Sequence, residues 1–190
     1  MTSLLLLREL KPLAASAGFT NSLAVTLLVI TGVVAAALAG VNAITKDAIA
    51  ANQAKKTQDA LAVVLPDAGS LQPVALSGDT GIVSEVYTDG ESYAVKVLPG
   101  GFDGEITLMV GIAEGKVSGI SVISHTETPG LGAVAVAQNA KGEAFRGQFV
   151  GQEGELAIGD QIDAMSGATI TSTAVVTGVN AALNYVANLG

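Results

Sequence analysis

The chain contains no cysteine, and this absence removes several kinds of site from consideration. Without thiols, a chain of 190 residues cannot form disulfides, ligate an iron–sulfur cluster through cysteine or use a cysteine nucleophile. Its single histidine, His125, cannot build a zinc or haem site alone. We therefore expect no metal centre. If the chain transfers electrons, an organic cofactor has to carry them.

Aromatic residues and positive charge are also scarce. There is no tryptophan, and nine Lys and Arg residues stand against seventeen Asp and Glu residues, for a net charge of −8. Nucleic-acid binding needs clustered positive charge, and the composition therefore argues against it. We interpret the acidic character simply as a source of solubility.

Charge is missing altogether from residues 12–45. Within this stretch the 19 residues Leu23–Val41 are apolar except for two threonines and two glycines. A helix of this length reaches about 28 Å, close to the thickness of the bilayer hydrocarbon, and it lacks the polar face of a core helix. We predict a membrane-spanning helix. A cleaved signal peptide is the alternative, because small residues precede Gly40, but the apolar run is longer than is usual for a signal peptide.

The span and the composition around it predict four parts. These are an N-terminal cytoplasmic or interfacial segment (1–21), a transmembrane helix (22–42), a helical stalk that continues it (43–66) and a folded domain (67–190). The stalk is alanine-rich and free of glycine, with Pro66 at its end. Basic residues lie on both sides of the span, and the charges therefore do not choose its orientation.

The pattern of apolar residues changes to a period of two from Leu71 onward, which indicates strands. The turn pairs Asp89-Gly90 and Glu114-Gly115 predict two hairpins. The expected strands are 82–87, 93–98, 104–113 and 116–124, with short helices at 133–140 and around Phe145, and a loop and edge strand over 151–160. The sequence therefore predicts an α+β domain with an antiparallel sheet.

Hydroxyl residues gather between Asp163 and Thr173, immediately before an apolar run with helical spacing. Such residues cap helix starts, because their oxygens accept hydrogen bonds from the free backbone N–H groups there. The same junction suits a phosphate, since the N–H groups and the helix dipole attract an anion and small residues let it approach. Thr169 is therefore either a cap or a phosphate-bearing side chain.

The segment Asp163-x-x-Ser166-Gly167-Ala168-Thr169 is similar to the flavinylation motif of the FMN-binding domains, whose last threonine carries FMN through a phosphoester. The resemblance implies covalent FMN on Thr169. It also implies a separate flavin transferase that takes the FMN half of FAD. Asp163 serves recognition by that transferase or is an ordinary turn residue, and the sequence leaves both open.

A second stretch, Ser124–Gly132, resembles the other signature of the same family. The implied cofactor-binding residues are Thr169, Ser166, Gly167, Ala168, Glu127, Thr128, Gly130, Leu131 and Gly132. Three neighbours are left outside this set. His125 reads better as a strand-end residue, and Arg146 either pairs with the phosphate or is a solvated charge. Gly100–Gly104 reads as a tight turn, because Asp103 stands where the family usually has glycine.

With the N-terminal span, these motifs resemble the G subunits of the Rnf ion-translocating oxidoreductases. The resemblance implies a single-pass flavoprotein of the inner (cell) membrane with a cytoplasmic N-terminus and an extracytoplasmic (periplasmic) FMN domain. It would relay electrons in a complex that couples ferredoxin:NAD⁺ electron flow to Na⁺ or H⁺ transport, beside other membrane subunits and without catalytic residues of its own. The alternatives are the C subunits of Na⁺-translocating NADH:quinone reductases and a stand-alone FMN-binding accessory or sensor domain. A pilin is disfavoured, because its apolar run would stand at the N-terminus.

Overall fold

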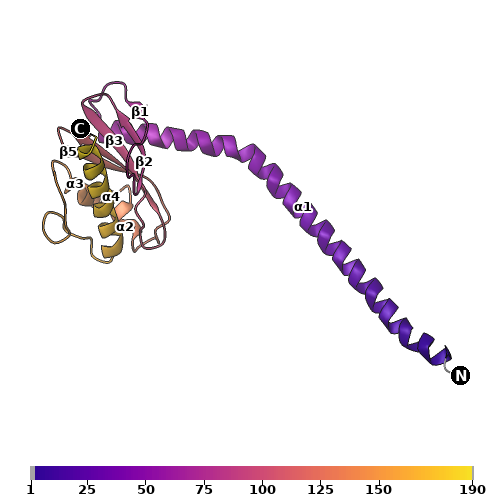
Figure 1. Cartoon of the computed structure of the whole chain (residues 1–190). Coiled ribbons are helices and arrows are strands. Elements are labelled where there is room, and N and C mark those ends of the chain that lie inside the picture. The colour runs from indigo at the N-terminus through magenta and orange to yellow at the C-terminus, as the bar shows by residue number, and fades with distance from the viewer. Residues whose placement is uncertain (1–2, 190) are drawn as a thin grey trace. The chain divides into compact units, whose positions relative to one another are not determined.

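The computed structural model describes the backbone of residues 3–189 and the side chains of residues 22–189. The chain forms two compact units, residues 1–52 and residues 53–190, which we describe separately. The elements are labelled in Figure 1. The interpretation of residues 1–21 as an interfacial segment depends on side chains outside the described ones, and the four-part division of the chain stays a prediction.

Helix α1 runs from Ser3 to Val64. Its residues up to Asn52 belong to the first unit, and its last turns, from Gln53, belong to the second. Helix α1 thus contains the apolar run and residues 43–64 of the predicted stalk. The side chains of residues 22–56 are exposed, and among the described residues this is the one helix long and apolar enough to cross a membrane. Its most apolar window has a mean hydropathy of 2.4. Exposed apolar surface on this scale needs an apolar solvent.

The second unit is built on a five-stranded antiparallel sheet in the order β1-β2-β3-β4-β5. The strands are β1 (Gln72–Val74), β2 (Val83–Thr88), β3 (Ser92–Val97), β4 (Ile106–Ala113) and β5 (Lys116–His125). Sequential neighbours pair throughout, which confirms the predicted α+β class and both hairpins. At Glu114-Gly115 both residues have positive φ, as a two-residue type I′ hairpin turn requires.

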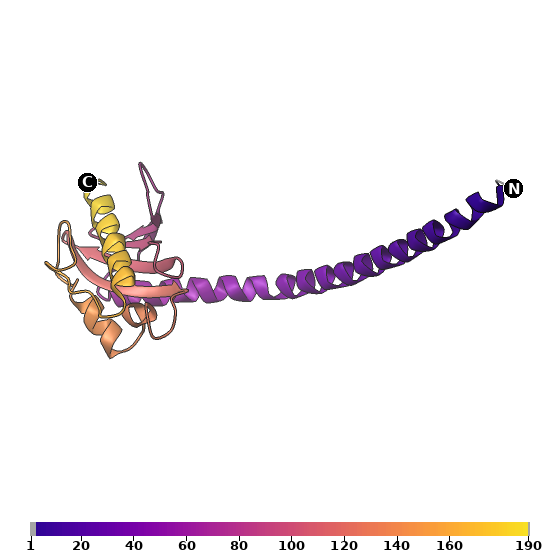
Figure 2. The ribbon, with the colours of Figure 1, turned by 90° about the horizontal axis from the view of Figure 1, so that it is seen from below.

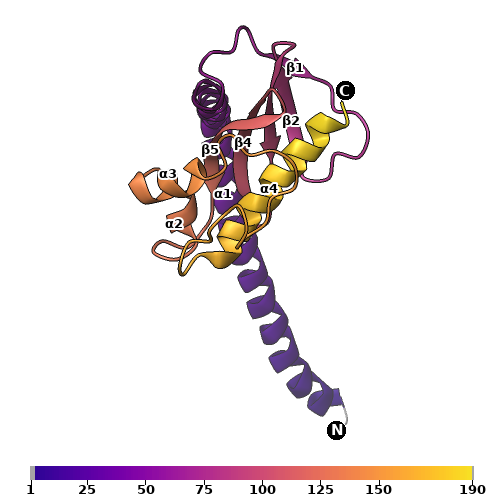
Figure 3. The ribbon, with the colours of Figure 1, turned by 90° about the vertical axis from the view of Figure 1, so that its left-hand side faces the viewer.

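Three helices complete this unit: α2 (Ala133–Val136), α3 (Ala140–Gly147) and α4 (Thr169–Ala187). Helix α4 lies across one face of the sheet, and α2 and α3 pack beside β5, with α2 also in contact with α4 (Figures 2 and 3). The predicted edge strand between residues 151 and 160 does not form within the described chain. Gly151, Gly154 and Gly159 all have positive φ there, and this backbone conformation breaks an extended strand.

The sheet buries side chains on both faces, because alternate residues of its strands point in opposite directions. Val95 and Val110 belong to the main core, which α4 covers. Ala94 and Met109 point the other way and pack on the last turns of α1, where Val64 is fully buried. In Figure 3 the strands accordingly lie between α4 and the end of α1. The last turns of α1 are therefore part of the folded domain.

The contact between α1 and the sheet depends on Gly111. The Ser118 hydroxyl donates to the Val64 carbonyl at 2.6 Å, and a Cβ on Gly111 would collide with both groups. We expect Gly111→Ala to lower the free energy of unfolding by about 2 kcal/mol, because a backbone carbonyl cannot move aside as a side chain can. Thermal unfolding of the full chain in detergent checks this. Gly69→Ala, where an added Cβ meets no atom within 4 Å, is the control and should change stability little.

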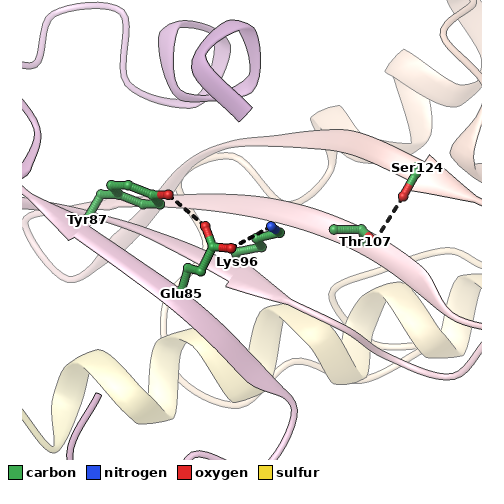
Figure 4. A network of polar contacts seen from close by, with 5 residues as sticks. All are labelled: Glu85, Tyr87, Lys96, Thr107 and Ser124. Carbon is green, nitrogen blue, oxygen red and sulfur yellow. Dashed lines mark hydrogen bonds and ion pairs between the residues drawn. The ribbon is translucent and has the colours of Figure 1, made fainter. Parts of the chain in front are cut away.

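A polar network crosses β2 and β3 (Figure 4). Lys96 Nζ lies 2.7 Å from Glu85 Oε1, and the Tyr87 hydroxyl donates to Glu85 Oε2 at 2.6 Å. Burial alone would raise the pKa of Glu85, but hydrogen bonds from Lys96 and Tyr87 outweigh it and hold that pKa below its usual value. Burial, and then the carboxylate beside it, raise the pKa of Tyr87 to about 12.

The ionisation of Tyr87 gives a direct test of this network. Because its folded pKa lies above the unfolded value of about 10, the protonated phenol stabilises the fold fully below pH 10. This contribution is lost as the pH rises through about 12. An ultraviolet titration of the full chain minus that of Tyr87→Phe should show a phenolate transition near pH 12. Glu85→Gln should move this transition towards pH 10, and an unshifted transition in the unsubstituted chain would contradict the network.

Candidate functional site

The start of α4 is held by hydroxyls that lie inside the helix. The N-cap residue is Ala168, whose methyl side chain cannot accept a hydrogen bond, and the preceding Gly167 has φ +79°. The Ser172 hydroxyl donates to the Ala168 carbonyl at 2.9 Å and accepts from the Met165 N–H at 3.1 Å. Ser172 therefore ties the turn before α4 to the helix, but no side chain among the described residues caps the first N–H groups of α4.

Thr169 is exposed at this junction, and its hydroxyl makes no hydrogen bond with any residue that the structure describes. The backbone N–H groups of Thr169, Ile170 and Thr171 likewise find no acceptor within the described chain. Free N–H groups at the positive end of a helix of 19 residues attract an anion. The arrangement therefore presents a hydroxyl and an anion-binding helix end at the same place.

Apolar side chains surround Thr169 although they are open to solvent. Phe102 is 59% exposed, Leu131 is 52% exposed and Ile170 is 56% exposed. Together with Gly132, Gly167, Thr169 and Thr171 they line a hollow of about 300 Å³. A second hollow of about 280 Å³ lies along α4 beside Pro99 and Gly100, and Thr169 lines both. This surface suits a ligand with an anionic group and an apolar, flat body.

The Glu127 carboxylate lies beneath this surface and joins three segments of chain. Its side chain is 3% exposed, and Oε1 accepts from the N–H groups of Phe102 at 2.8 Å and Asp103 at 3.2 Å. Its other oxygen, Oε2, accepts from the Thr171 hydroxyl on α4. Glu127 thus fixes the 100–104 turn, the loop after β5 and the start of α4 against one another.

Glycine makes room for this carboxylate. A Cβ on Gly101 would collide with Oε1 of Glu127, and one on Gly132 would collide with Oε2 and with the Thr171 hydroxyl. Both glycines are therefore needed for the carboxylate to lie where its three donors converge. The prediction that Glu127 itself contacts a cofactor stays a prediction. In the structure both carboxylate oxygens of Glu127 accept hydrogen bonds from other groups of the protein.

Asp103 adds a second link between the turn and the loop. Its carboxylate accepts from the Thr128 hydroxyl at 3.1 Å, and its carbonyl accepts from the Thr126 hydroxyl at 3.2 Å. The sequence predicts an ordinary turn here, because aspartate replaces glycine. The turn forms as predicted, with the Gly101 N–H donating to the Gly104 carbonyl at 2.6 Å, and the aspartate in addition ties it to the predicted loop and so places Phe102 beside Thr169.

The remaining predicted residues fall into one place. Ser166 and Gly167 are exposed next to Thr169, whereas Ala168 is buried, and Gly130 has φ +80° at the tip of the neighbouring loop. The backbone of Asp163 is held by the Gln148 side chain, which accepts from its N–H at 2.8 Å and donates to its carbonyl at 3.3 Å. Both interpretations of Asp163 therefore stay open.

Two basic residues lie elsewhere. Arg146 is buried in α3, and its Nη1 donates to the carbonyl of Ala137 at 3.0 Å; it lines neither hollow beside Thr169. The interpretation of Arg146 as a solvated charge is therefore wrong. His125 is exposed at the end of β5, as expected. No group of three or more metal-ligating side chains occurs among the described residues.

Sequence reasoning missed Phe102 and Ile170. One signal was available for each. Phe102 is one of only four phenylalanines and stands in a glycine-rich turn, where a large apolar residue has no core to fill. For Ile170 the signal in the sequence is its position directly after Thr169. In the structure 56% of Ile170 is exposed, although α4 buries most of its apolar side chains.

Comparison with known proteins gives two kinds of similarity. A family model for the FMN-binding domain matches residues 101–184, which include most of the turn, the loop and α4 as far as Asn184. The G subunit of the ion-translocating oxidoreductase complex of Methanosarcina acetivorans is 35% identical over 181 residues, which cover 85% of this chain and 92% of the relative.

Two further relatives are similar over comparable lengths. The G subunit of the proton-translocating ferredoxin:NAD(+) oxidoreductase complex of Clostridium ljungdahlii is 35% identical over 88% of this chain and 89% of its own length. The G subunit of the Na(+)-translocating ferredoxin:NAD(+) oxidoreductase complex of Acetobacterium woodii is 33% identical over 88% of this chain and 91% of its own.

Proposed function

The chain belongs to the G subunits of the Rnf-type ion-translocating oxidoreductase complexes, and from this premise we propose that it relays electrons through FMN esterified to Thr169. The observation that carries the proposal is the Thr169 hydroxyl at the start of α4, which has no partner among the described residues and lies beside N–H groups equally without one and beside exposed apolar side chains. When bound, FMN supplies reversible uptake and release of electrons.

The residues around Thr169 fit the two ends of FMN. The N–H groups of residues 169–171 would hold the phosphate, and Phe102, Leu131 and Ile170 would lie against the apolar ring. Exposed aromatic and aliphatic side chains cost the free protein an unfavourable contact with water, which a flat ring would relieve. The hydrogen bonds of the buried Glu127 carboxylate hold the Phe102 turn and the start of α4 in position next to each other.

Attachment of the flavin requires an activating group that the surroundings of Thr169 lack. A threonine hydroxyl is a poor nucleophile without a base, and the buried Glu127 carboxylate is already bound to three donors. We therefore assign attachment to a separate flavin transferase. The Thr169 oxygen forms the new phosphoester bond, the pyrophosphate bond of FAD breaks, AMP leaves, and the hydroxyl proton is lost to a base of the transferase.

We assign this carrier to the inner membrane, anchored by helix α1, with its N-terminus in the cytoplasm and its FMN domain outside. A flavin released outside the cytoplasm would be lost by dilution, whereas a covalent tether keeps its local concentration high. The relatives differ in the ion that their names give, protons in one and Na⁺ in another, and we assign either Na⁺ or H⁺ to the complex. Their full-length similarity favours ferredoxin:NAD⁺ electron flow over a quinone reductase or a stand-alone domain.

Purification of the chain from the membranes of cells that make its complex tests the proposal. The denatured chain should fluoresce under ultraviolet light on a gel, and mass spectrometry should find the FMN phosphoester on a peptide that contains Thr169. The other membrane subunits should copurify before denaturation. A denatured chain without flavin would disprove the covalent linkage, and a chain that purifies without partners would disprove membership of a complex.

A further inference from the structure

A groove of about 840 Å³ lies on the second unit, away from Thr169. Its walls come from the last turns of α1 within this unit and from the end of α3, and β5 passes along it. Lys56 and Asp59 stand on one side, Glu143 and Arg146 stand on the other, and residues 118–123 of β5 line it between them. None of these residues takes part in the flavin site.

The strand in this groove has an unpaired edge. β5 is the last strand of the sheet, and at Val117 its outward N–H and C=O are bonded to Gln152 and Gly151. At Val122 the outward carbonyl accepts from Gln138 Nε2 at 3.5 Å. Ile120 is two residues before Val122 in a regular part of the pairing, and its N–H and C=O therefore also point away from β4. The Ile120 groups have no partner in the described chain.

An unpaired strand edge inside a groove selects the kind of ligand. Backbone N–H and C=O groups that are withdrawn from water are nearly always paired, and the partner that matches their spacing is another extended backbone. Among the described residues, the chain itself pairs this edge at Val117, bonds the carbonyl of Val122 and leaves Ile120 between them free. The groove therefore has the form of a site for one added strand.

Arg146 indicates that a ligand of this groove carries a negative charge. It is 8% exposed, and Nη1 donates to the carbonyls of Ala135 and Ala137. No carboxylate lies within ion-pair distance of it among the described residues, although Glu143 is on the same helix. Burial lowers the pKa of Arg146, because a desolvated cation without an ion pair is destabilised. A carboxylate brought into the groove would relieve this cost through charge-assisted hydrogen bonds.

We propose that this groove binds an extended segment of another subunit of the same complex, which pairs with β5 at Ile120 and places an acidic side chain on Arg146. The choice of partner rests on the proposed function, since a subunit of a membrane complex has neighbours that bind it permanently. The groove would then hold the flavin domain in a fixed orientation towards the subunit with which it exchanges electrons.

Site-specific photo-crosslinking in native membranes tests this proposal. A photoreactive benzoyl-phenylalanine replaces Val150, which is 53% exposed on the groove wall, or, as a control, Val74, which is 36% exposed on β1 at the other edge of the sheet. We expect Val150 to yield an adduct with another subunit of the complex, on a segment that contains Asp or Glu. The control at Val74 should not yield this adduct.

A groove-filling substitution supplies the matched variant. Gly147 lines the groove, and a Cβ there meets no atom within 4 Å, as is also the case at Gly69 outside it. Gly147→Trp should reduce the adduct roughly tenfold by occupying the groove, and Gly69→Trp should leave it unchanged. Flavin fluorescence of the denatured chain should persist in both, which separates failure of the groove from failure of the flavin site.

Four outcomes would overturn the proposal. These are the absence of any adduct at Val150, an adduct only with lipid or with a second copy of this chain, a crosslinked segment without an acidic residue, and an adduct that Gly147→Trp does not reduce. Each is read on chains that retain their flavin, so that loss of the fold cannot imitate it.

Discussion

Replacing Thr169 with valine should remove all flavin fluorescence from the denatured chain and leave the fold intact. Valine has the shape of threonine without the oxygen that would carry the phosphoester. The Thr169 hydroxyl is exposed and makes no hydrogen bond with the described residues, and the free energy of unfolding should therefore change by less than about 0.5 kcal/mol. A gel viewed under ultraviolet light and a thermal unfolding curve of the full chain measure the two effects.

Thr173→Val is the matched control for this experiment. Thr173 is exposed one turn further along α4, and its hydroxyl donates to the Thr169 carbonyl at 2.9 Å. Thr173→Val makes the same change on the same helix but leaves the Thr169 hydroxyl in place, and this variant should therefore keep its flavin. If both variants fluoresced, or if neither did, Thr169 would not be the attachment site.

The second large effect is expected at Glu127. Glu127→Ala leaves two backbone N–H groups and the Thr171 hydroxyl without their acceptor in a buried position. Each unsatisfied donor costs about 1–3 kcal/mol, and the summed loss of stability should reach about 3 kcal/mol or more. The melting temperature of the full chain in detergent should fall by roughly 10 °C. Flavin attachment should fall with it, because Phe102 and Thr169 are no longer held together.

Glu127→Gln separates positioning from charge. Glutamine keeps a carbonyl oxygen for the N–H groups of Phe102 and Asp103, and the Thr171 hydroxyl can rotate to accept from its amide. This variant should retain flavin and most of the stability, whereas Glu155→Ala, on the surface, should behave as the unsubstituted chain does. Full stability and full flavin content in Glu127→Ala would show that the carboxylate does not hold the site together.

The fold could be predicted from the sequence wherever a local pattern decided it. The apolar run of α1, the turn pairs between strands and the helical spacing of α4 each depend on neighbouring residues, and each prediction agrees with the structure. The failed edge strand over residues 151–160 shows the opposite case. The segment bonds to Val117 at one point and to Asn180 of α4 at another, and its glycines turn the chain between these contacts, which its own sequence does not indicate.

The site was only partly predictable for a related reason. Thr169 and the 127–132 loop were found through their motifs, but the direction of the Glu127 side chain depends on three segments that meet only after folding. The tight turn at Gly100–Gly104 was predicted correctly, but the role of Asp103 in joining it to the 127–132 loop was not. Its bond to Thr128 exists only in the folded domain. The sequence left Arg146 as a phosphate partner or a solvated charge, because nothing in its neighbours along the chain indicates that α3 buries it.

The burial of Val64 beneath the sheet has a consequence for how the domain can be made and studied. Ala60 and Leu65 share this small core, and a soluble version of the head that began at the stalk boundary near residue 66 would strip Met109 and Ala94 of their cover. A version that began near Gln53 would keep it. Because α1 precedes the strands in the chain, these helical turns are synthesised before the sheet that packs on them, and the end of α1 takes part in folding of the head as well as joining it to the anchor.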